Sequence, residues 1–114
     1  MRNIVFALLL LLATVRPAGA HRAHRWRLLP VTWVTGYDNT GRTSTGSWAR
    51  SGECAVDPRY IPFGSIIRIP GVGVCRAEDT GGAVVGWHVD VWEPTAAACY
   101  RITGWYRGVS VWSN

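Results

Sequence analysis

Three aspartates stand in settings that are unusual for surface carboxylates. Asp57 follows an apolar pair and precedes Pro58, Asp79 opens an Asp-Thr-Gly-Gly turn, and Asp90 lies in the middle of an apolar strand pattern. Aspartate is disfavoured inside strands, and burying a carboxylate without partners is costly. Carboxyl groups in such places are candidates for acid–base chemistry. Each also has a structural interpretation, as a turn cap or as the partner of an arginine.

Short strands are expected to position these aspartates. Apolar or alternating runs predict five strands, and a proline followed by alanines predicts one helix: strands at residues 31–37, 65–69, 74–78, 87–92 and 108–112, and a helix at 94–100. Residues 38–52 are rich in Gly, Ser and Thr and predict a loop whose length indicates a function. Many short strands in one small chain favour a compact β-barrel.

The strand expected at 87–92 determines the surroundings of Asp90. Val89 and Val91 share one face with Trp87, whereas His88 shares the other face with Asp90. A proton donor near neutral pH needs a raised pKa, and flanking apolar side chains raise it by desolvation. His88 is expected to orient Asp90 or to contact a substrate; its alternative is an ordinary surface histidine.

Composition limits the classes of protein. The chain has 114 residues, of which 48% are hydrophobic and 17% charged. These values fit one globular domain and exclude a multidomain enzyme, a disordered tail and a coiled coil. The formal net charge is +5, yet all twelve basic residues are arginine. Polybasic nucleic-acid binders usually mix lysine with arginine, so no nucleic-acid partner is expected.

The N-terminus has the features of a secretory signal peptide: a positive start at Arg2, an apolar stretch at 4–15 and small residues ending at Ala20. The stretch is shorter than the about 20 residues that span a bilayer, although an uncleaved N-terminal anchor is an alternative. We expect a signal peptide at 1–20 that is cleaved after Ala20. A basic arm at 21–30 and one domain at 31–114 then form a periplasmic or secreted monomer without stable membrane insertion.

Three ordered motifs and one earlier segment resemble the 3D domain, a family named for its three aspartates. They read AVDPRYIPFG at 55–64, AEDTGGAVVG at 77–86 and HVDV at 88–91, preceded by TSTG at 43–46. The resemblance covers residues 34–112, and three motifs in the right order and spacing form a specific signal. The family is related to the membrane-bound lytic transglycosylase A and to the stationary-phase muralytic factors.

The resemblance implies a mainly β fold, a small six-stranded double-psi β-barrel with one short helix. It also implies a lytic transglycosylase that cleaves the MurNAc-GlcNAc glycan strands of peptidoglycan. Asp90 would be the general acid and afterwards the base, while Asp79 and Asp57 would complete the catalytic site and keep Asp90 protonated. The residues expected to bind substrate lie in the TSTG loop, in the turn after Asp79 and beside Asp90: Thr45, Gly46, Trp48, Thr80, Gly81, Gly82 and His88.

Other classes of function stay open. Related barrels bind wall polysaccharide through aromatic side chains and arginines, or loosen the wall, without cutting it. The triplet Asp79-Thr80-Gly81 matches that of dimeric aspartic proteases, but Glu78 stands where these proteases need an apolar residue. An N-terminal His21 after cleavage is similar to the terminal histidine of copper monooxygenases, for which the chain lacks a convincing second ligand pattern.

The convergence of Asp57 and Asp79 that the resemblance implies predicts one disulfide. If Asp57 and Asp79 converge on one site, the strands leading into them run side by side in the same direction, which makes Cys54 and Cys75 neighbours. Cys99 would then stay free as a small buried thiol on the expected helix. A Cys75–Cys99 bridge and three unpaired cysteines are the alternatives. No two cysteines have the close spacing of a metal site, so we expect neither a metal nor another cofactor.

Overall fold

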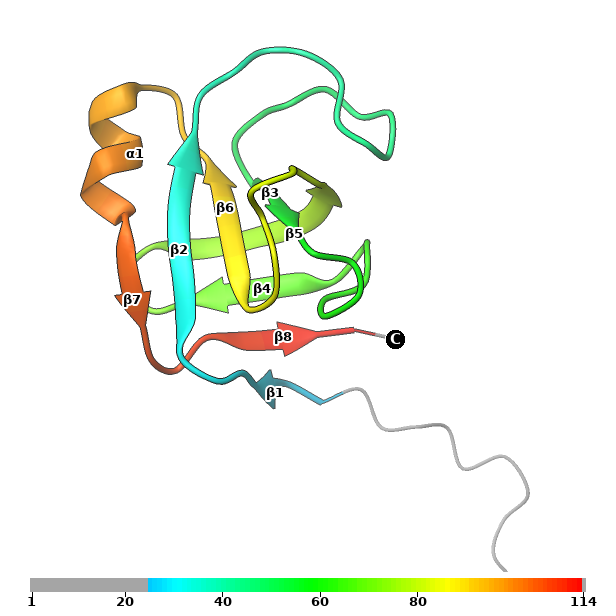
Figure 1. Cartoon of the computed structure of the whole chain (residues 1–114), viewed down its shortest axis with the longest axis vertical. Helices are drawn as coiled ribbons and strands as arrows, with labels where there is room; N and C mark the ends of the chain where they lie inside the picture. The colour runs from blue at the N-terminus through cyan, green and yellow to red at the C-terminus, as the bar shows by residue number, and fades with distance from the viewer. Residues whose placement is uncertain (1–24, 114) are drawn as a thin grey trace, which may run out of the picture.

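The computed structural model describes residues 25–113, which form one mixed β-sheet of eight strands and one short helix (Figure 1). In chain order the elements are β1 (Arg27–Leu28), β2 (Thr32–Tyr37), β3 (Glu53–Val56), β4 (Ile66–Ile69), β5 (Gly73–Asp79), β6 (His88–Trp92), α1 (Ala96–Ile102), β7 (Gly104–Tyr106) and β8 (Ser110–Trp112). The expected mainly β class with one short helix is confirmed. The expected signal peptide at 1–20 and the start of the basic arm lie outside the described residues.

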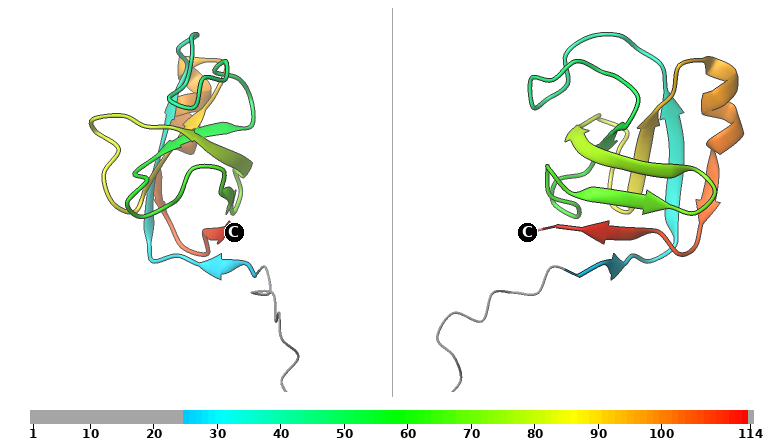
Figure 2. Two further views of the ribbon diagram at one scale, coloured as in Figure 1. Left: turned by 90° about the vertical axis from the view of Figure 1, so that its right-hand side faces the viewer. Right: turned by 180° about the vertical axis from the view of Figure 1, so that it is seen from behind.

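Two parallel strand pairs lie at the centre of the sheet. β2 runs parallel to β6 and β3 runs parallel to β5, while the antiparallel contact of β3 with β6 joins the two pairs. The complete order is β1-β8-β4-β5-β3-β6-β2-β7. Figure 1 and the right-hand view of Figure 2, which are opposite views, show β4 and β5 across the molecule from β2 and β6, with α1 beside β2. The strands that carry or precede the three aspartates, β3, β5 and β6, are therefore adjacent.

The sheet has eight strands rather than the six expected. The additional strands β1 and β7 are its outermost members and contain only two and three residues. The alternation of polar and apolar residues predicted no strand at either place. Without them, the inner six strands remain as β8-β4-β5-β3-β6-β2.

β3 is the third strand that periodicity did not predict. All four of its residues are buried, and a strand covered on both faces shows no alternation of polar and apolar residues. The expected loop at 38–52 ends directly before this strand. The other strands and the helix begin and end within two residues of the expected positions.

α1 begins two residues after the expected proline, because Thr95 caps it. The Thr95 backbone is extended, and its hydroxyl accepts a hydrogen bond from the N–H of Ala98 at 3.1 Å. The helix packs on β2 at Gly36, where a Cβ atom would lie 2.6 Å from the Cα of Cys99, so this contact requires glycine. Within residues 25–113, no helix is long and apolar enough to cross a membrane.

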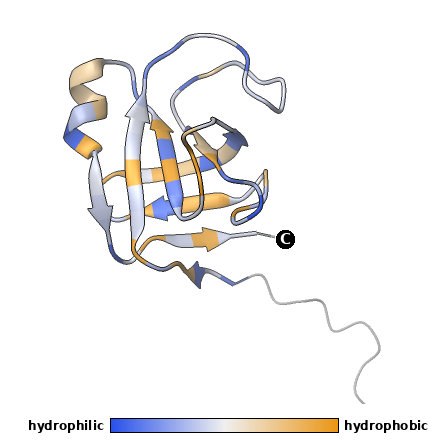
Figure 3. Cartoon of the chain, viewed as in Figure 1, coloured by the Kyte–Doolittle hydropathy of each residue, from blue (hydrophilic) through white to orange (hydrophobic). Residues whose placement is uncertain are grey.

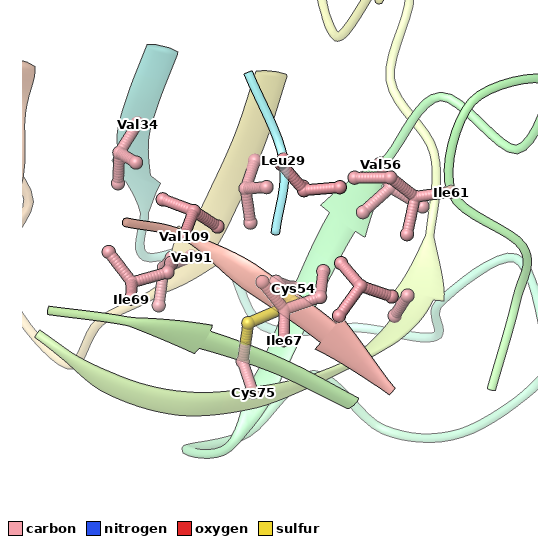
Figure 4. Close-up of a cluster of buried hydrophobic side chains, with 13 residues drawn as sticks. Leu29, Val34, Cys54, Val56, Ile61, Ile67, Ile69, Cys75, Val91 and Val109 are labelled. Carbon is pink, nitrogen blue, oxygen red and sulfur yellow. A yellow bond between two sulfur atoms is a disulfide. The ribbon is translucent and has the colours of Figure 1, made fainter. Parts of the chain in front are cut away.

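Aliphatic side chains from the inner six strands form the core, together with residues of the connecting segments (Figure 4). Along β6, Val89 and Val91 are buried in this core, whereas His88 and Asp90 are only half-buried on the other face. Figure 3 shows the resulting hydrophobic and hydrophilic bands along the strand. The predicted alternation of β6 is thus confirmed.

A disulfide joins Cys54 on β3 to Cys75 on β5, with their Cα atoms 5.8 Å apart (Figure 4). The predicted pairing is confirmed, and so is its premise that the strands leading into Asp57 and Asp79 run in parallel. Cys99 is free, as expected. It is half-buried rather than fully buried, because no residue of α1 is buried.

Replacing both bridged cysteines by alanine is expected to lower the free energy of unfolding by about 3 kcal/mol, because the bridge closes a loop across a separation of 21 residues. Urea unfolding followed by far-UV circular dichroism measures the change. Cys99→Ala is the matched control and should shift the midpoint far less, since the bridge is retained. Equal midpoints for the wild type and the double variant would contradict a stabilising bridge.

Candidate functional site

The outward face of β2 and β6 carries the groups that are best suited to chemistry. Val34 and Val89 on the opposite face are fully buried. The parallel register places the outward residues opposite one another in three rows: Trp33 with His88, Thr35 with Asp90, and Tyr37 with Trp92. Successive rows are two residues apart, which is about 7 Å along a strand.

Thr35 links Asp90 to His88. The Thr35 hydroxyl donates to Oδ1 of Asp90 at 2.7 Å, and the hydroxyl oxygen Oγ1 of Thr35 lies 2.7 Å from Nε2 of His88. Nδ1 of His88 faces the backbone carbonyl oxygen of Ala83 at 3.2 Å. Three hydrogen bonds therefore run from the β6 carboxyl to the β5–β6 loop and orient the side chains between them.

This chain of hydrogen bonds is fully satisfied in two arrangements that contain the same number of protons. In one, Thr35 donates to an ionised Asp90, and His88 donates from both ring nitrogens as an imidazolium. In the other, a protonated Asp90 donates to Thr35, whose hydroxyl donates to Nε2 of a neutral His88. In both, Nδ1 donates to Ala83. A proton can thus pass between Asp90 and His88 through Thr35 without leaving any of these groups unpaired.

The surroundings of Asp90 favour its protonated form. Burial has the largest effect and raises the pKa of Asp90. The hydrogen bond from Thr35 and a positive charge on His88 lower the pKa, and the charge of Asp79 raises it. The net result is a raised pKa, which is the direction expected from the apolar neighbours of Asp90 in the sequence. A raised pKa is what a general acid near neutral pH requires.

Asp79 anchors the TSTG segment to the end of β5. Its Oδ1 accepts hydrogen bonds from the N–H and the hydroxyl of Ser44, at 3.0 and 2.8 Å, and from the N–H of Thr80 at 2.8 Å. The N–H of Thr45 donates to the carbonyl of Glu78 at 3.2 Å. Two motifs that are far apart in the sequence therefore meet at the carboxyl end of β5.

Asp57 is 3% exposed, and both of its carboxylate oxygens are occupied. Oδ1 accepts from the N–H and Nε of Arg59, while Oδ2 accepts from Nη2 of Arg59 at 2.7 Å and from the N–H of Gly86 at 2.9 Å. The Arg59 side chain above all, then Gly86, holds the pKa of Asp57 well below its usual range. An ionised, fully bonded carboxylate is a poor proton donor. The geometry favours a positioning role, in which Asp57 fixes the loop just before His88.

The residues expected to bind substrate fall into two groups. His88 belongs to the chain that reaches Asp90. The others lie in the loop 38–52 and in the turn that follows β5: Thr45, Gly46, Trp48, Thr80, Gly81 and Gly82. The hydroxyls of Ser44 and Thr80, 2.9 Å apart, join these two segments. Trp48 is 60% exposed, and the Arg42 guanidinium lies over its ring at 4.8 Å.

Sequence reasoning missed a second group of buried polar side chains. Glu53 is 2% exposed, and its Oε1 lies 3.5 Å from Nε of Arg50 in an ion pair. Burial has the largest effect and raises the pKa of Glu53; the Ser47 hydroxyl lowers this pKa, and the Glu78 carboxyl raises it. Burial also has the largest effect on Tyr37 and raises its pKa. The charges of Asp79, Glu53 and Asp90 raise this pKa further. Three carboxyl groups thus lie near the Tyr37 hydroxyl.

Only weak sequence signals pointed to these residues. Thr35 and Tyr37 lie on a predicted strand and alternate with its buried residues, but that strand does not reveal its neighbour. Glu53 directly precedes Cys54, a position that suggests burial only once β3 is known. Among residues 25–113, no group of three or more His, Cys, Asp or Glu side chains is arranged to hold a metal ion.

Comparisons with known proteins match the part of the chain that carries the three aspartates and His88. Residues 53–113 match the model of the 3D domain. The chain is 38% identical over 66 residues to YabE of Bacillus subtilis (strain 168), a protein named for cell wall shaping. It is 49% identical over 41 residues to YocH of the same strain, named a cell wall-binding protein. The matches cover 54% and 36% of this chain, but only 16% and 14% of these relatives.

Asp57→Asn is expected to lower the thermal unfolding midpoint by several degrees near pH 7, because asparagine cannot form the ion pair with Arg59. A carboxyl whose pKa falls on folding stabilises the protein above its unfolded-state pKa of about 4, and this contribution declines at lower pH. The difference between wild type and variant should therefore shrink from about pH 5 to about pH 3. Melting curves across this range measure it.

The exposed Asp38→Asn is the matched control and should change the midpoint little at any of these pH values. A deficit of Asp57→Asn that stays constant, or that grows as the pH falls, would show that the ion pair is not the cause.

Proposed function

The chain belongs to the 3D domain family, and from this membership and the outward face of β2 and β6 we propose that it binds the glycan strands of peptidoglycan. The observation that carries the proposal is the hydrogen-bonded chain through Thr35. It holds a carboxyl and an imidazole side by side on an open face, between rows that contain Trp33 and Trp92. Few, well-oriented polar groups among aromatic side chains are typical of ligand sites.

The names of the two relatives support this proposal. One is named for shaping and the other for binding the cell wall. Because the matches span small parts of these proteins, a wall-related role is a proposal for this chain. We also propose export to the periplasm or the exterior, with cleavage after Ala20. The disulfide supports export, since such bonds persist in oxidising compartments.

We further propose that the sheet adopts the double-psi β-barrel that the family resemblance implies. The inner six strands contain two parallel pairs, β2 with β6 and β3 with β5, joined by the antiparallel pair β3 with β6. All four of these strands contribute side chains to one core. This supports a barrel that has its site on the outer face of β2 and β6.

The wild-type protein is expected to sediment with purified sacculi. Thr35→Val keeps the shape of the side chain but removes the hydroxyl that orients Asp90 and His88, so it should bind several-fold more weakly. Thr103→Val makes the same chemical change at the end of α1 and is the control, expected to bind like the wild type. Absence of wild-type binding, or equal binding by Thr35→Val, would refute the proposed binding face.

A second candidate function is cleavage of the glycan strand, and the raised pKa of Asp90 favours it. The Asp90 carboxyl would give its proton to the glycosidic oxygen while the bond from that oxygen to C1 breaks. The carboxylate would then take the proton of the sugar's own 6-hydroxyl as O6 bonds to C1. The product is a 1,6-anhydro sugar, no water is consumed, and Asp90 ends protonated as it began.

The neighbours of Asp90 support this cycle electrostatically. The charge of Asp79 raises the pKa of Asp90 and so favours the acid form before the first step. After the first step, the Thr35 hydroxyl can donate to the new carboxylate, as it does in the structure. Titration of this group would belong to the coupled set of side chains rather than to Asp90 alone.

Asp90→Asn is expected to abolish release of anhydro-muropeptides from sacculi while sacculus binding persists, because an amide cannot cycle the proton. Asp79→Asn should also reduce release, partly through a lower pKa of Asp90. Mass spectrometry of the soluble products reads the result, with Asp38→Asn as the matched control. Reducing-end products would indicate hydrolysis, and no soluble product from the wild type would leave binding alone. Full release by Asp90→Asn would refute the assignment of the acid.

A further inference from the structure

An open aromatic pocket lies beside the row of Thr35 and Asp90. It has a volume of about 400 Å³ and is lined by five side chains: Trp33, Val85, Trp87, His88 and Trp105. Volumes of about 300–1,000 Å³ are typical of small-molecule sites. Of the residues that the sequence predicted to bind substrate, His88 alone lines this pocket.

Strand register builds the floor of the pocket. Trp33 pairs with His88 on β6 and with Trp105 on β7, so the three residues form one row across three strands. The rings of Trp33 and Trp105 lie 5.0 Å apart between centroids, inclined by 53°. Trp105 is nevertheless 70% exposed. An exposed large apolar ring that faces a pocket indicates a contact surface for a ligand.

The wall of the pocket is held in place without a ligand. The Trp87 ring packs edge-on against Tyr60, with centroids 5.1 Å apart. The backbone N–H of Trp33 donates to the backbone carbonyl of Trp87 at 3.0 Å and joins the two segments. Because the Trp87 ring packs on Tyr60 and the Trp33 ring packs on Trp105, a ligand has few side chains to order, which lowers the entropy cost of binding.

The lining selects a ligand with little charge. Trp33, Trp87, Trp105 and Val85 offer aromatic and apolar surface, and His88 is the one ionisable side chain of the five. A sugar ring presents a face of C–H groups to an aromatic ring, and its acetamido methyl group is apolar. A peptide rich in carboxylates would instead need arginines at this place.

We propose that this pocket binds an N-acetylated sugar ring next to the glycosidic bond that lies at Asp90. This inference rests on the proposed glycan-binding function. The row of Trp33 and His88 is the neighbour of the row of Thr35 and Asp90, about 7 Å away along the strand, so a glycan that reaches Asp90 can extend into the pocket. His88 belongs to both sites, so it contacts the sugar on one side and Thr35 on the other.

The seven tryptophans provide a direct test, because each indole N–H gives its own NMR signal. Single Trp→Phe variants assign the signals. Titration with chitotetraose, an N-acetylglucosamine oligomer, is expected to shift the signals of Trp33, Trp87 and Trp105. The signal of Trp26, which lies at the other edge of the sheet under Arg68, should not move. Cellotetraose lacks acetamido groups and should need about tenfold higher concentrations.

Trp105→Ala is expected to weaken chitotetraose binding about tenfold or more, and Trp26→Ala is the matched control with unchanged affinity. Pocket signals that do not shift, or equal affinity of Trp105→Ala, would overturn the pocket assignment. Shifts that depend on protein concentration without sugar would also overturn it, since a second copy of the chain would then be the occupant. Sedimentation of the wild-type protein with sacculi is measured separately. If the protein does not bind sacculi but chitotetraose still shifts the indole signals, the proposed function is refuted and the pocket assignment is not.

Discussion

The parallel pairing of β2 with β6 is the contact on which the rest of the site depends. Its register places Thr35 opposite Asp90, within reach of a 2.7 Å hydrogen bond. The same register keeps Val34 and Val89 fully buried on the other face. A slip of one residue would turn the polar residues into the core and expose the aliphatic ones. Burial of the valines therefore fixes the strand register, and this register alone places Thr35 opposite Asp90.

Features that lie along one strand could be predicted from the sequence, whereas features that depend on strand partners could not. Alternation along β6 identified Asp90 and separated it from the buried valines. Thr35 also lies on a predicted strand, but its partner Asp90 follows 55 positions later, and no local pattern reveals that pairing. Trp105 lies on a strand too short for a pattern. The Cys54–Cys75 pair was predictable because the resemblance supplied the long-range premise, the convergence of two aspartates.

Asp57 and Asp90 show how surroundings divide the roles of identical side chains. Arg59 and Gly86 lower the pKa of Asp57, so this carboxylate stabilises the fold above its unfolded-state pKa and loses that effect as the pH falls. Burial raises the pKa of Asp90 and of Glu53. Their contribution is favourable below their unfolded-state pKa and is lost as the pH rises through the folded-state value. A buried carboxyl that opposes folding near neutral pH is a cost typical of functional sites.

The proposed binding and the proposed cleavage would use the same face, and they differ in whether Asp90 transfers a proton. Binding needs only the shape and the hydrogen bonds that both arrangements of the Thr35 chain provide. Cleavage also needs Asp90 to give up its proton and to take one back at the same place. Exchange through Thr35 gives that proton a second position on His88, inside the site. A wall-binding and a wall-cleaving domain can therefore share every contact described above. The two kinds of domain would differ in the distance between the glycosidic oxygen and the Asp90 carboxyl. The row of Trp33 would set this distance by holding the neighbouring sugar.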